Sequence, residues 1–254
     1  MAGKGARGRG GWLRAYLLTV ALTAMVIVVV ANVPVTTKQG VNFEVSEHRL
    51  PLYVKTFEFL DRHTQYRQIA AEATRGAVTD ADKLQAVFDW TARRIQPTPE
   101  TWTIVDDHIL NIIIRGYGSS DQRADVCATL LTYAGVPAYW QRVNTTPDRK
   151  AGAIFTRAFV GGRWVVFDVA SGFLFRTSDG RFAEPVDFAA HRVVVPAAAA
   201  DLLINGVPYT QVLDAITSSP APRTLRAELQ MPWPRLWYMT KRAIGLEADH
   251  GSEQ

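Results

Sequence analysis

The sequence GYGSSDQRADVCATLLTYAGVPAYWQRVN, residues 116–144, carries the pattern that decides the fold. Ser119 or Ser120 can cap a helix because a short side-chain oxygen accepts hydrogen bonds from the first free backbone N–H groups. Gly135 ends this helix, and the β-rich residues 139–144 predict a strand directly after it. The apolar face of the helix consists of Ala124, Cys127, Leu131 and Ala134.

The flanking segments extend this pattern in both directions. Downstream, two β-rich runs, residues 154–160 and 163–169, are separated by Gly161-Gly162, which is a dipeptide typical of a two-residue hairpin turn. Upstream, residues 52–74 and 79–95 predict helices, the second with Thr79 as its cap. Helices followed by an antiparallel hairpin indicate an α+β fold.

Four short motifs in this region resemble those of the transglutaminase-like superfamily. They are GYGSSDQ (residues 116–122), ATLL (128–131), AGVPA (134–138) and GRWVVFD (162–168). The first three are similar to the helix that carries the nucleophile of that family, and the fourth to the strand that carries its third catalytic residue. The resemblance implies an α+β, papain-like core in which helices pack on an antiparallel sheet that helps to carry a Cys-His-Asp triad.

Two of the three catalytic positions depart from the family pattern. The cysteine position holds Ser120, and residues 151–158, where the histidine should lie, contain none. Only Asp168 matches the family triad. A serine hydroxyl becomes a nucleophile only beside a positioned base, and loss of triad members lowers turnover on the order of a millionfold. The resemblance therefore implies a catalytically inactive domain.

Two alternatives keep an enzyme open. Ser120 could serve an atypical hydrolase or acyltransferase with His108 or His191 as its base, although neither lies where the family places its histidine. Cys127 could act as a displaced nucleophile, but its place on the apolar helix face favours a buried, inert thiol. Contact between a histidine and Ser120 would support the first alternative.

The N-terminal part of the sequence predicts a membrane anchor. Residues 15–37 contain no charge and are long enough to cross a bilayer. The positive charges before them predict that residues 1–14 stay in the cytoplasm. We therefore expect a single-pass protein of the inner (cytoplasmic) membrane, bacterial by its composition, whose domain at residues 50–217 is periplasmic. The alternative is a cleaved signal peptide, whose apolar core is usually shorter.

Residues 218–254 read as a linker followed by an amphipathic aromatic and basic segment. Trp233, Trp237 and Tyr238 lie close to several cations in this segment, a composition that suits a membrane–water interface or a protein contact. The expected partners are the lipid bilayer and, through these aromatics, a membrane protein or an envelope glycan or peptide. The alternative is a closing helix whose tryptophans pack on the domain.

Charge and cysteine content exclude several other classes. The chain has 28 Lys and Arg against 24 Asp and Glu, and four of the cations precede residue 32, so the rest is balanced. A balanced domain gives no support to nucleic-acid binding. A single cysteine excludes intramolecular disulfides and cysteine-based metal sites. Asp106, Asp107 and His108 read as a cap or turn rather than a metal site, so no cofactor or metal is expected. The predicted role is that of a binding or scaffolding module in the cell envelope.

Overall fold

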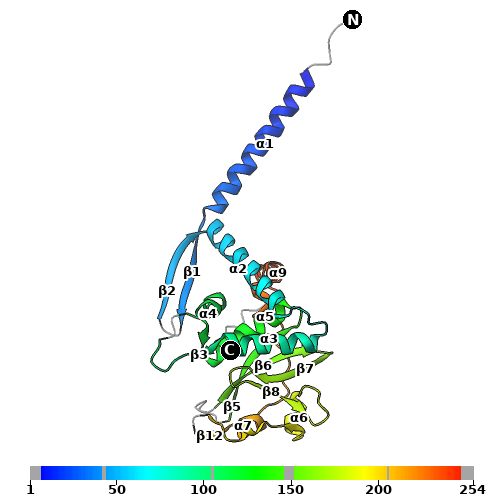
Figure 1. Cartoon of the computed structure of the whole chain (residues 1–254). Helices are drawn as coiled ribbons and strands as arrows, with labels where there is room; N and C mark the ends of the chain where they lie inside the picture. The colour runs from blue at the N-terminus through cyan, green and yellow to red at the C-terminus, as the bar shows by residue number, and fades with distance from the viewer. Residues whose placement is uncertain (1–6, 42–43, 104–105, 146–151, 205, 247–254) are drawn as a thin grey trace. The chain divides into compact units, whose positions relative to one another are not determined.

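The computed structural model describes residues 7–41, 44–103, 106–145, 152–204 and 206–246 (Figure 1). The chain forms two compact units, residues 1–60 and residues 61–254. The boundary between them falls inside helix α2 (Leu52–Ala73).

The first unit begins with a long apolar helix. Helix α1 spans Arg7–Ala31, and its part Gly11–Ala31 is long and apolar enough to cross a membrane, a criterion that signal sequences also meet. Pro34 follows shortly after, and proline cannot continue a helix because it lacks a backbone N–H. The helix therefore ends at Ala31, six residues before the end of the charge-free run 15–37.

A hairpin follows that the sequence patterns did not predict. Strands β1 (Pro34–Val41) and β2 (Glu44–Pro51) pair in antiparallel register, with Pro34 opposite Pro51. The Leu52 N–H donates to the Val33 carbonyl at 2.9 Å. This hydrogen bond joins the residue before β1 to the residue after β2. Helix α2 therefore starts beside the end of α1.

The second unit is built around one buried helix. Helix α5 (Ser120–Tyr133) is buried at every position from Gln122 to Thr132, and α3 (Asp80–Arg94) and α4 (Ile109–Arg115) pack against it. Thr79 caps α3 in the predicted capping box, in which the Asp82 N–H donates to the Thr79 hydroxyl oxygen at 3.1 Å.

The sheet of the second unit confirms the predicted strand–hairpin order. Its strands β5 (Ala138–Asn144), β6 (Gly152–Val160), β7 (Arg163–Asp168) and β8 (Phe173–Leu174) follow one another in antiparallel pairs. Gly161 and Gly162 turn between β6 and β7 with φ of 58° and 82°, values that favour glycine.

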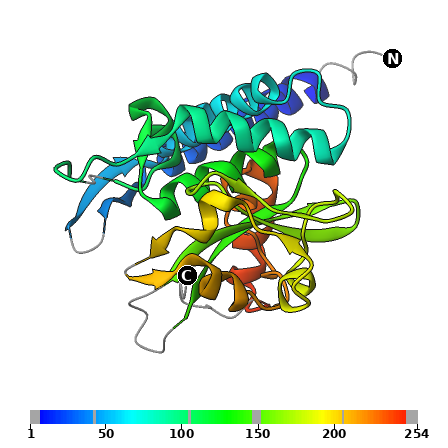
Figure 2. The same cartoon turned by 60° about the horizontal axis from the view of Figure 1, so that its bottom comes forward.

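Alternate side chains of these strands enter two apolar clusters on opposite faces of the sheet. Ala158 and Phe167 contribute to the cluster under α3 and α5, whereas Phe155 and Val166 contribute to the other, with Tyr209. Figures 1 and 2 show α3 and α5 on one side of the sheet and α6 (Pro185–Ala189) and α7 (Ala197–Ala200) on the other. The structure thus confirms an α+β fold with helices packed on an antiparallel sheet.

Short elements complete the second unit. The paired strands are β3 (Gln96–Pro97) with β4 (Tyr117–Gly118), β9 (Arg176–Thr177) with β10 (Val193–Val194), and β11 (Leu203–Ile204) with β12 (Val207–Pro208). The remaining helices are α8 (Tyr209–Asp214), the 3₁₀ helix η1 (Glu228–Gln230) and α9 (Pro232–Ala243).

The C-terminal segment is partly anchored and partly exposed. Leu225 and Ala227 are buried, and the Tyr133 hydroxyl of α5 donates to the Gln230 carbonyl at 2.7 Å. Helix α9 itself contains no buried residue, and Trp233 and Trp237 are 79% and 63% exposed. The alternative in which these tryptophans pack as part of the core is therefore wrong.

Candidate functional site

Ser120, the residue that the sequence predicts at the nucleophile position, is the first residue of α5. The preceding Ser119 closes a capping box with Gln122, in which the Ser119 N–H donates to Gln122 Oε1 at 3.2 Å, and the Ser119 hydroxyl donates to Asp121. Ser120 is exposed, and among the described residues no hydrogen bond reaches its hydroxyl. The hydroxyl of Ser120 is therefore open to solvent and has no hydrogen-bonded neighbour in the described part of the chain that would activate it as a nucleophile.

Gln122 ties the start of α5 to the chain before α4. Its side chain is buried, accepts from Arg115 Nη2 at 2.6 Å, and donates to Asp107 Oδ1 at 2.6 Å and to the Asp106 carbonyl at 3.1 Å. Arg115 Nη1 also donates to the Asp106 carbonyl, at 3.0 Å. This network fixes residues 106 and 107 against the first turn of α5.

Asp106 serves as a turn and cap residue, as predicted. Its Oδ1 accepts from the His108 N–H at 2.8 Å, and its Oδ2 accepts from Asn111 Nδ2 at 3.1 Å. Both carboxylate oxygens are thereby committed to the start of α4. No group of three or more potential metal ligands occurs within the described ranges.

Asp168, the other predicted site residue, lies at the end of β7 and is 1% exposed. Its Oδ1 accepts from the Ser171 N–H at 2.9 Å, and its Oδ2 accepts from the Tyr209 hydroxyl at 2.7 Å. Burial raises the pKa of this carboxyl group, and the hydrogen bonds from Ser171 and Tyr209 oppose that shift. The carboxylate has a tyrosine partner where the family pattern implies a histidine.

Arg123 connects α5 with the loop after β7. It is 6% exposed, and its Nη1 donates to the Ala170 carbonyl at 2.6 Å. Burial lowers the pKa of its guanidinium group, and the negative charge of Asp168 acts in the opposite direction. Two buried ionisable groups therefore lie where α5 meets the end of β7.

The histidines take other positions. His191 has an 81% exposed side chain with Nδ1 3.9 Å from Asp214 Oδ1. His63 Nδ1 lies 2.9 Å from the Tyr133 hydroxyl, and burial lowers the pKa of its imidazole. His108 is the N-cap residue of α4. In the described ranges no histidine is hydrogen-bonded to Ser120, so the contact required by the serine-enzyme alternative is not formed.

Cys127 is fully buried in α5, in the cluster that α3 and α5 form with the sheet. Burial raises the pKa of its thiol to about 12, against smaller opposing effects of Thr91 and Arg123. A thiol with such a pKa is not ionised at neutral pH, and the thiolate is the reactive form. The structure confirms that Cys127 is buried, and its raised pKa is in line with the expected lack of reactivity.

A polar cavity of about 150 Å³ opens beside the first turns of α5. Asp125, 5% exposed, pairs with Arg226 Nη2 at 3.1 Å. Burial raises the pKa of Asp125, the charge of Arg226 opposes this, and Asp121 and Asp107 add to the rise. The cavity is lined by Asp107, Asp121, Gln122, Asp125, Trp140 and Arg226.

Sequence reasoning missed this cavity. Asp121 and Asp125 are one helical turn apart, so two like charges lie on one face of α5. Because like charges at this spacing repel each other, the pattern indicates that a cation lies nearby. Arg226 comes from 101 positions further along the chain, and no local pattern indicates that it folds back onto α5. The combination of carboxylates, an indole and a guanidinium group suits a small ligand with hydroxyl or ammonium donors.

Comparisons with other proteins give a partial structural likeness. No family model and no curated protein matches the sequence. The chain is similar to a candidate cysteine protease from Cytophaga hutchinsonii (16% identity, TM-score 0.37, covering 44% of this chain and 38% of that one). It is also similar to a candidate protease from Parabacteroides distasonis (12%, 0.34, 54% and 36%) and to a TGase (11%, 0.34, 53% and 43%). The chain therefore spans less than half the length of each of these structures.

Proposed function

We propose that this protein is a membrane-anchored, extracytoplasmic domain of transglutaminase-like type that no longer catalyses acyl transfer. Its role is that of a binding or scaffolding module of the bacterial cell envelope. The single observation that carries this proposal is the state of the two triad positions: Ser120 is exposed without a base, and Asp168 is buried with Tyr209 as its partner. A hydroxyl without a base and an orienting group lacks the means of activation.

The N-terminal helix supports the proposed anchor and its proposed orientation. Gly11–Ala31 has 21 residues, which as a helix extend about 30 Å, the thickness of the hydrocarbon core. The cations at positions 4, 7 and 9 precede this helix segment and Arg14 lies in its first turn, so the positive-inside rule favours an N-terminus in the cytoplasm. Residues 61–254 would lie on the other side of the inner membrane.

The polar cavity beside α5 supports a binding role for the second unit. Asp121 and Asp125 offer acceptor oxygens, and Trp140 offers an aromatic surface. These groups complement a glycan hydroxyl or a peptide ammonium group. The proposed ligand is therefore an envelope glycan or peptide fragment, bound without covalent chemistry.

A serine-directed fluorophosphonate probe tests the loss of catalysis on the full chain in detergent. We expect the wild type to label no more than Ser120→Ala, with Ser218→Ala as the matched control at an exposed serine outside the site. Labelling that Ser120→Ala abolishes and Ser218→Ala retains would establish the serine enzyme instead.

Titration calorimetry with soluble cell-wall glycan peptides tests the binding role. Replacing an acceptor or an aromatic surface costs about 1 to 2 kcal/mol, so Asp121→Asn and Trp140→Ala should each weaken binding by about 5- to 30-fold. Trp102→Ala, at an exposed tryptophan outside the cavity, is the control and should bind as the wild type does. Equal weakening by all three variants would argue against the cavity as the binding site.

A further inference from the structure

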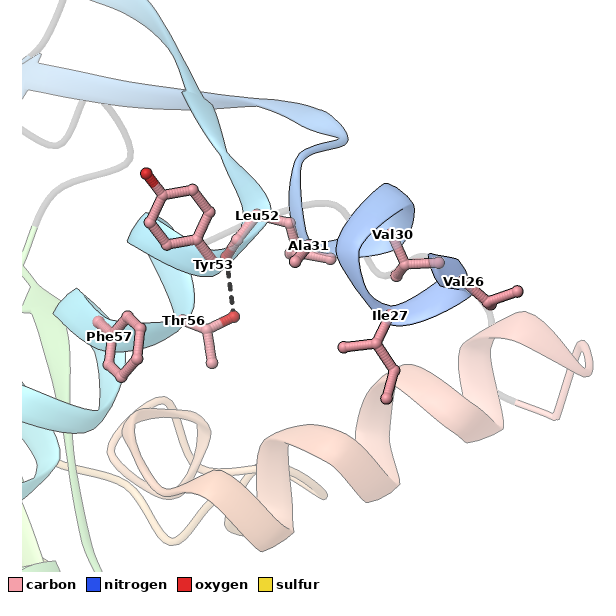
Figure 3. Close-up of a pocket in the computed structure, with 8 residues that line it drawn as sticks. All are labelled: Val26, Ile27, Val30, Ala31, Leu52, Tyr53, Thr56 and Phe57. Atoms are coloured by element: carbon pink, nitrogen blue, oxygen red, sulfur yellow. Dashed lines mark hydrogen bonds between the residues drawn. The ribbon is translucent and has the colours of Figure 1, made fainter. Parts of the chain in front are cut away.

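An apolar pocket lies inside the first unit, where the end of α1 meets the start of α2. Its volume is about 410 Å³, and Figure 3 shows side chains from both helices around it. The pocket is lined by Val26, Ile27, Val30, Ala31, Leu52, Tyr53, Thr56 and Phe57.

The wall of this pocket offers almost nothing to a polar ligand. The Thr56 hydroxyl donates to the Leu52 carbonyl of its own helix at 2.8 Å, and in Figure 3 the Tyr53 hydroxyl points away from the α1 side chains. Lys55 Nζ donates to the Thr36 carbonyl of the hairpin at 2.8 Å and does not line the pocket. A polar group placed here would lose its hydrogen bonds to water without replacement.

The pocket is also a defined part of the fold. The hydrogen bond from the Leu52 N–H to the Val33 carbonyl fixes the start of α2 beside the end of α1, and the β1–β2 hairpin closes the connection between them. The two walls are therefore held together by the backbone. Water fills apolar cavities poorly, whereas apolar molecules enter them.

Several apolar side chains that line the pocket are largely exposed, and exposure of apolar surface to water is energetically unfavourable. Ile27, Val30 and Phe57 are 61%, 50% and 68% exposed. Contiguous exposed apolar surface marks a site that another apolar phase or molecule covers. The α1 residues of the lining lie in the last two turns of the candidate membrane span, which extends to Ala31, so they lie within about 8 Å of its end.

The geometry points to an acyl chain of a bilayer lipid as the occupant of this pocket. This inference rests on the proposed membrane anchor, because the medium around the end of α1 is then lipid. The pocket is continuous with the surface that α1 presents to that lipid, and interfacial helices bury their apolar faces to a depth of about 5 to 10 Å. The first two turns of α2, with Tyr53 and Phe57, thereby become part of the anchor.

Photo-cross-linking tests this inference on the full chain in vesicles of phosphatidylethanolamine and phosphatidylglycerol. A lipid with a diazirine on its acyl chain is activated, and cross-linked peptides are mapped by mass spectrometry. We expect adducts on residues 52–57 as well as at the middle of α1, around Val20. Adducts at Val20 without any on residues 52–57 overturn the lipid pocket and leave the anchor intact, whereas no adducts on α1 contradict the anchor itself.

A pocket-filling substitution separates binding in the pocket from general contact with lipid. Ala31→Phe puts a benzyl group where the acyl chain would lie, so adducts on residues 52–57 should fall at least about fivefold while those at Val20 persist. Val29→Phe is the matched control, because Val29 is exposed on α1 but does not line the pocket. Thr56→Leu fills the same space from α2 and covers the case in which Ala31→Phe distorts the helix. Equal adducts in all variants, or cross-links to a second copy of the chain in their place, overturn the proposal.

Discussion

The two units of this chain treat polarity in opposite ways. Residues 1–60 expose large apolar side chains along α1 and the start of α2, including Val28 at 60% and Phe57 at 68%. Residues 61–254 bury charged side chains, among them Asp125, Asp168 and Asp187. Exposed apolar side chains are therefore concentrated on the helices of the first unit, and buried charged side chains lie in the second.

The contrast also separates two kinds of concave surface. The apolar pocket takes its lining from two helices that adjoin one another across a short hairpin, whereas the polar cavity gathers residues from positions 107 to 226. A local pocket of hydrocarbon suits a chain of methylene groups, and a cavity with fixed charges suits a ligand with matching donors. Substitutions that reverse the polarity of each unit test this comparison.

The largest effect is expected from charges placed inside α1. Val20→Asp combined with Ala24→Asp should abolish membrane integration, because each carboxylate near the centre of a span costs about 3 kcal/mol. Extraction of membranes with alkaline carbonate measures integration, and Val20→Leu with Ala24→Leu is the control of equal position and unchanged polarity. Retention of the aspartate variant in the membrane pellet would contradict the assignment of α1 as a span.

The second largest effect is expected at Asp187, which lies at the start of α6 and is fully buried. It accepts from Arg181 Nη1 and Nη2 at 2.7 Å each and lies 2.8 Å from Arg192 Nη2. Loss of this carboxylate removes its hydrogen bonds from the two arginines and from the Glu184 N–H, and hydrogen bonds to charged groups contribute enough that the total cost is about 3 kcal/mol. Asp187→Ala should lower the free energy of unfolding by that amount in urea titrations in micelles, and Asp179→Ala, at an exposed carboxylate near the same arginine, should change it little.

The fold followed from the sequence wherever local patterns determine structure. The capping box of α3, the helix–strand order after Ser119 and the Gly161-Gly162 turn each depend on neighbouring residues, and the structure confirms them. The β1–β2 hairpin was missed because β1 begins inside the charge-free run 15–37, and because the sequence between the strands contains no typical turn dipeptide. Elements defined by near neighbours were therefore predictable.

The candidate site depended on contacts between distant residues and was predicted only in part. Ser120 and Asp168 were predicted through a family resemblance. In the structure Ser120 is exposed, whereas Asp168 is buried. The hydrogen-bond partner of Asp168 is Tyr209, 41 positions away, and the ion-pair partner of Asp125 is Arg226, 101 positions away. Tertiary pairings of this kind leave no periodicity or spacing in the sequence.

Buried acids in the second unit should respond to pH with opposite signs. The Arg181 hydrogen bonds lower the pKa of Asp187, so its stabilising contribution is present above about pH 4 and is lost as the pH falls through its folded pKa. Burial raises the pKa of Asp125, so its contribution is greatest below about pH 4 and is lost as the pH rises through its folded pKa.

Urea unfolding between pH 3 and pH 8 measures both effects on the full chain. In the wild type, Asp125 should make the free energy of unfolding fall as the pH rises, and Asp125→Asn should lack this fall. Asp187 should make the free energy of unfolding increase as the pH rises, and Asp187→Asn should lack this increase. Slopes of the same sign for both variants would show that the two carboxyl groups do not occupy the different environments described above.

The smallest effect on stability is expected at α9, the part of the second unit whose exposed apolar surface resembles that of the first. Trp233→Ala with Trp237→Ala should change the free energy of unfolding by only about 0.5 kcal/mol, since both rings are exposed. The same rings, with Lys241 5.4 Å from the Trp237 ring centre, suit an anionic membrane surface. Trypsin cleavage after Lys241 should therefore be slower in phosphatidylglycerol vesicles than in phosphatidylcholine vesicles, and the double variant should lose that protection. Equal cleavage of the wild type in both lipids would show that α9 does not bind the anionic surface. In that case, lipid contact would be expected only for residues 1–60.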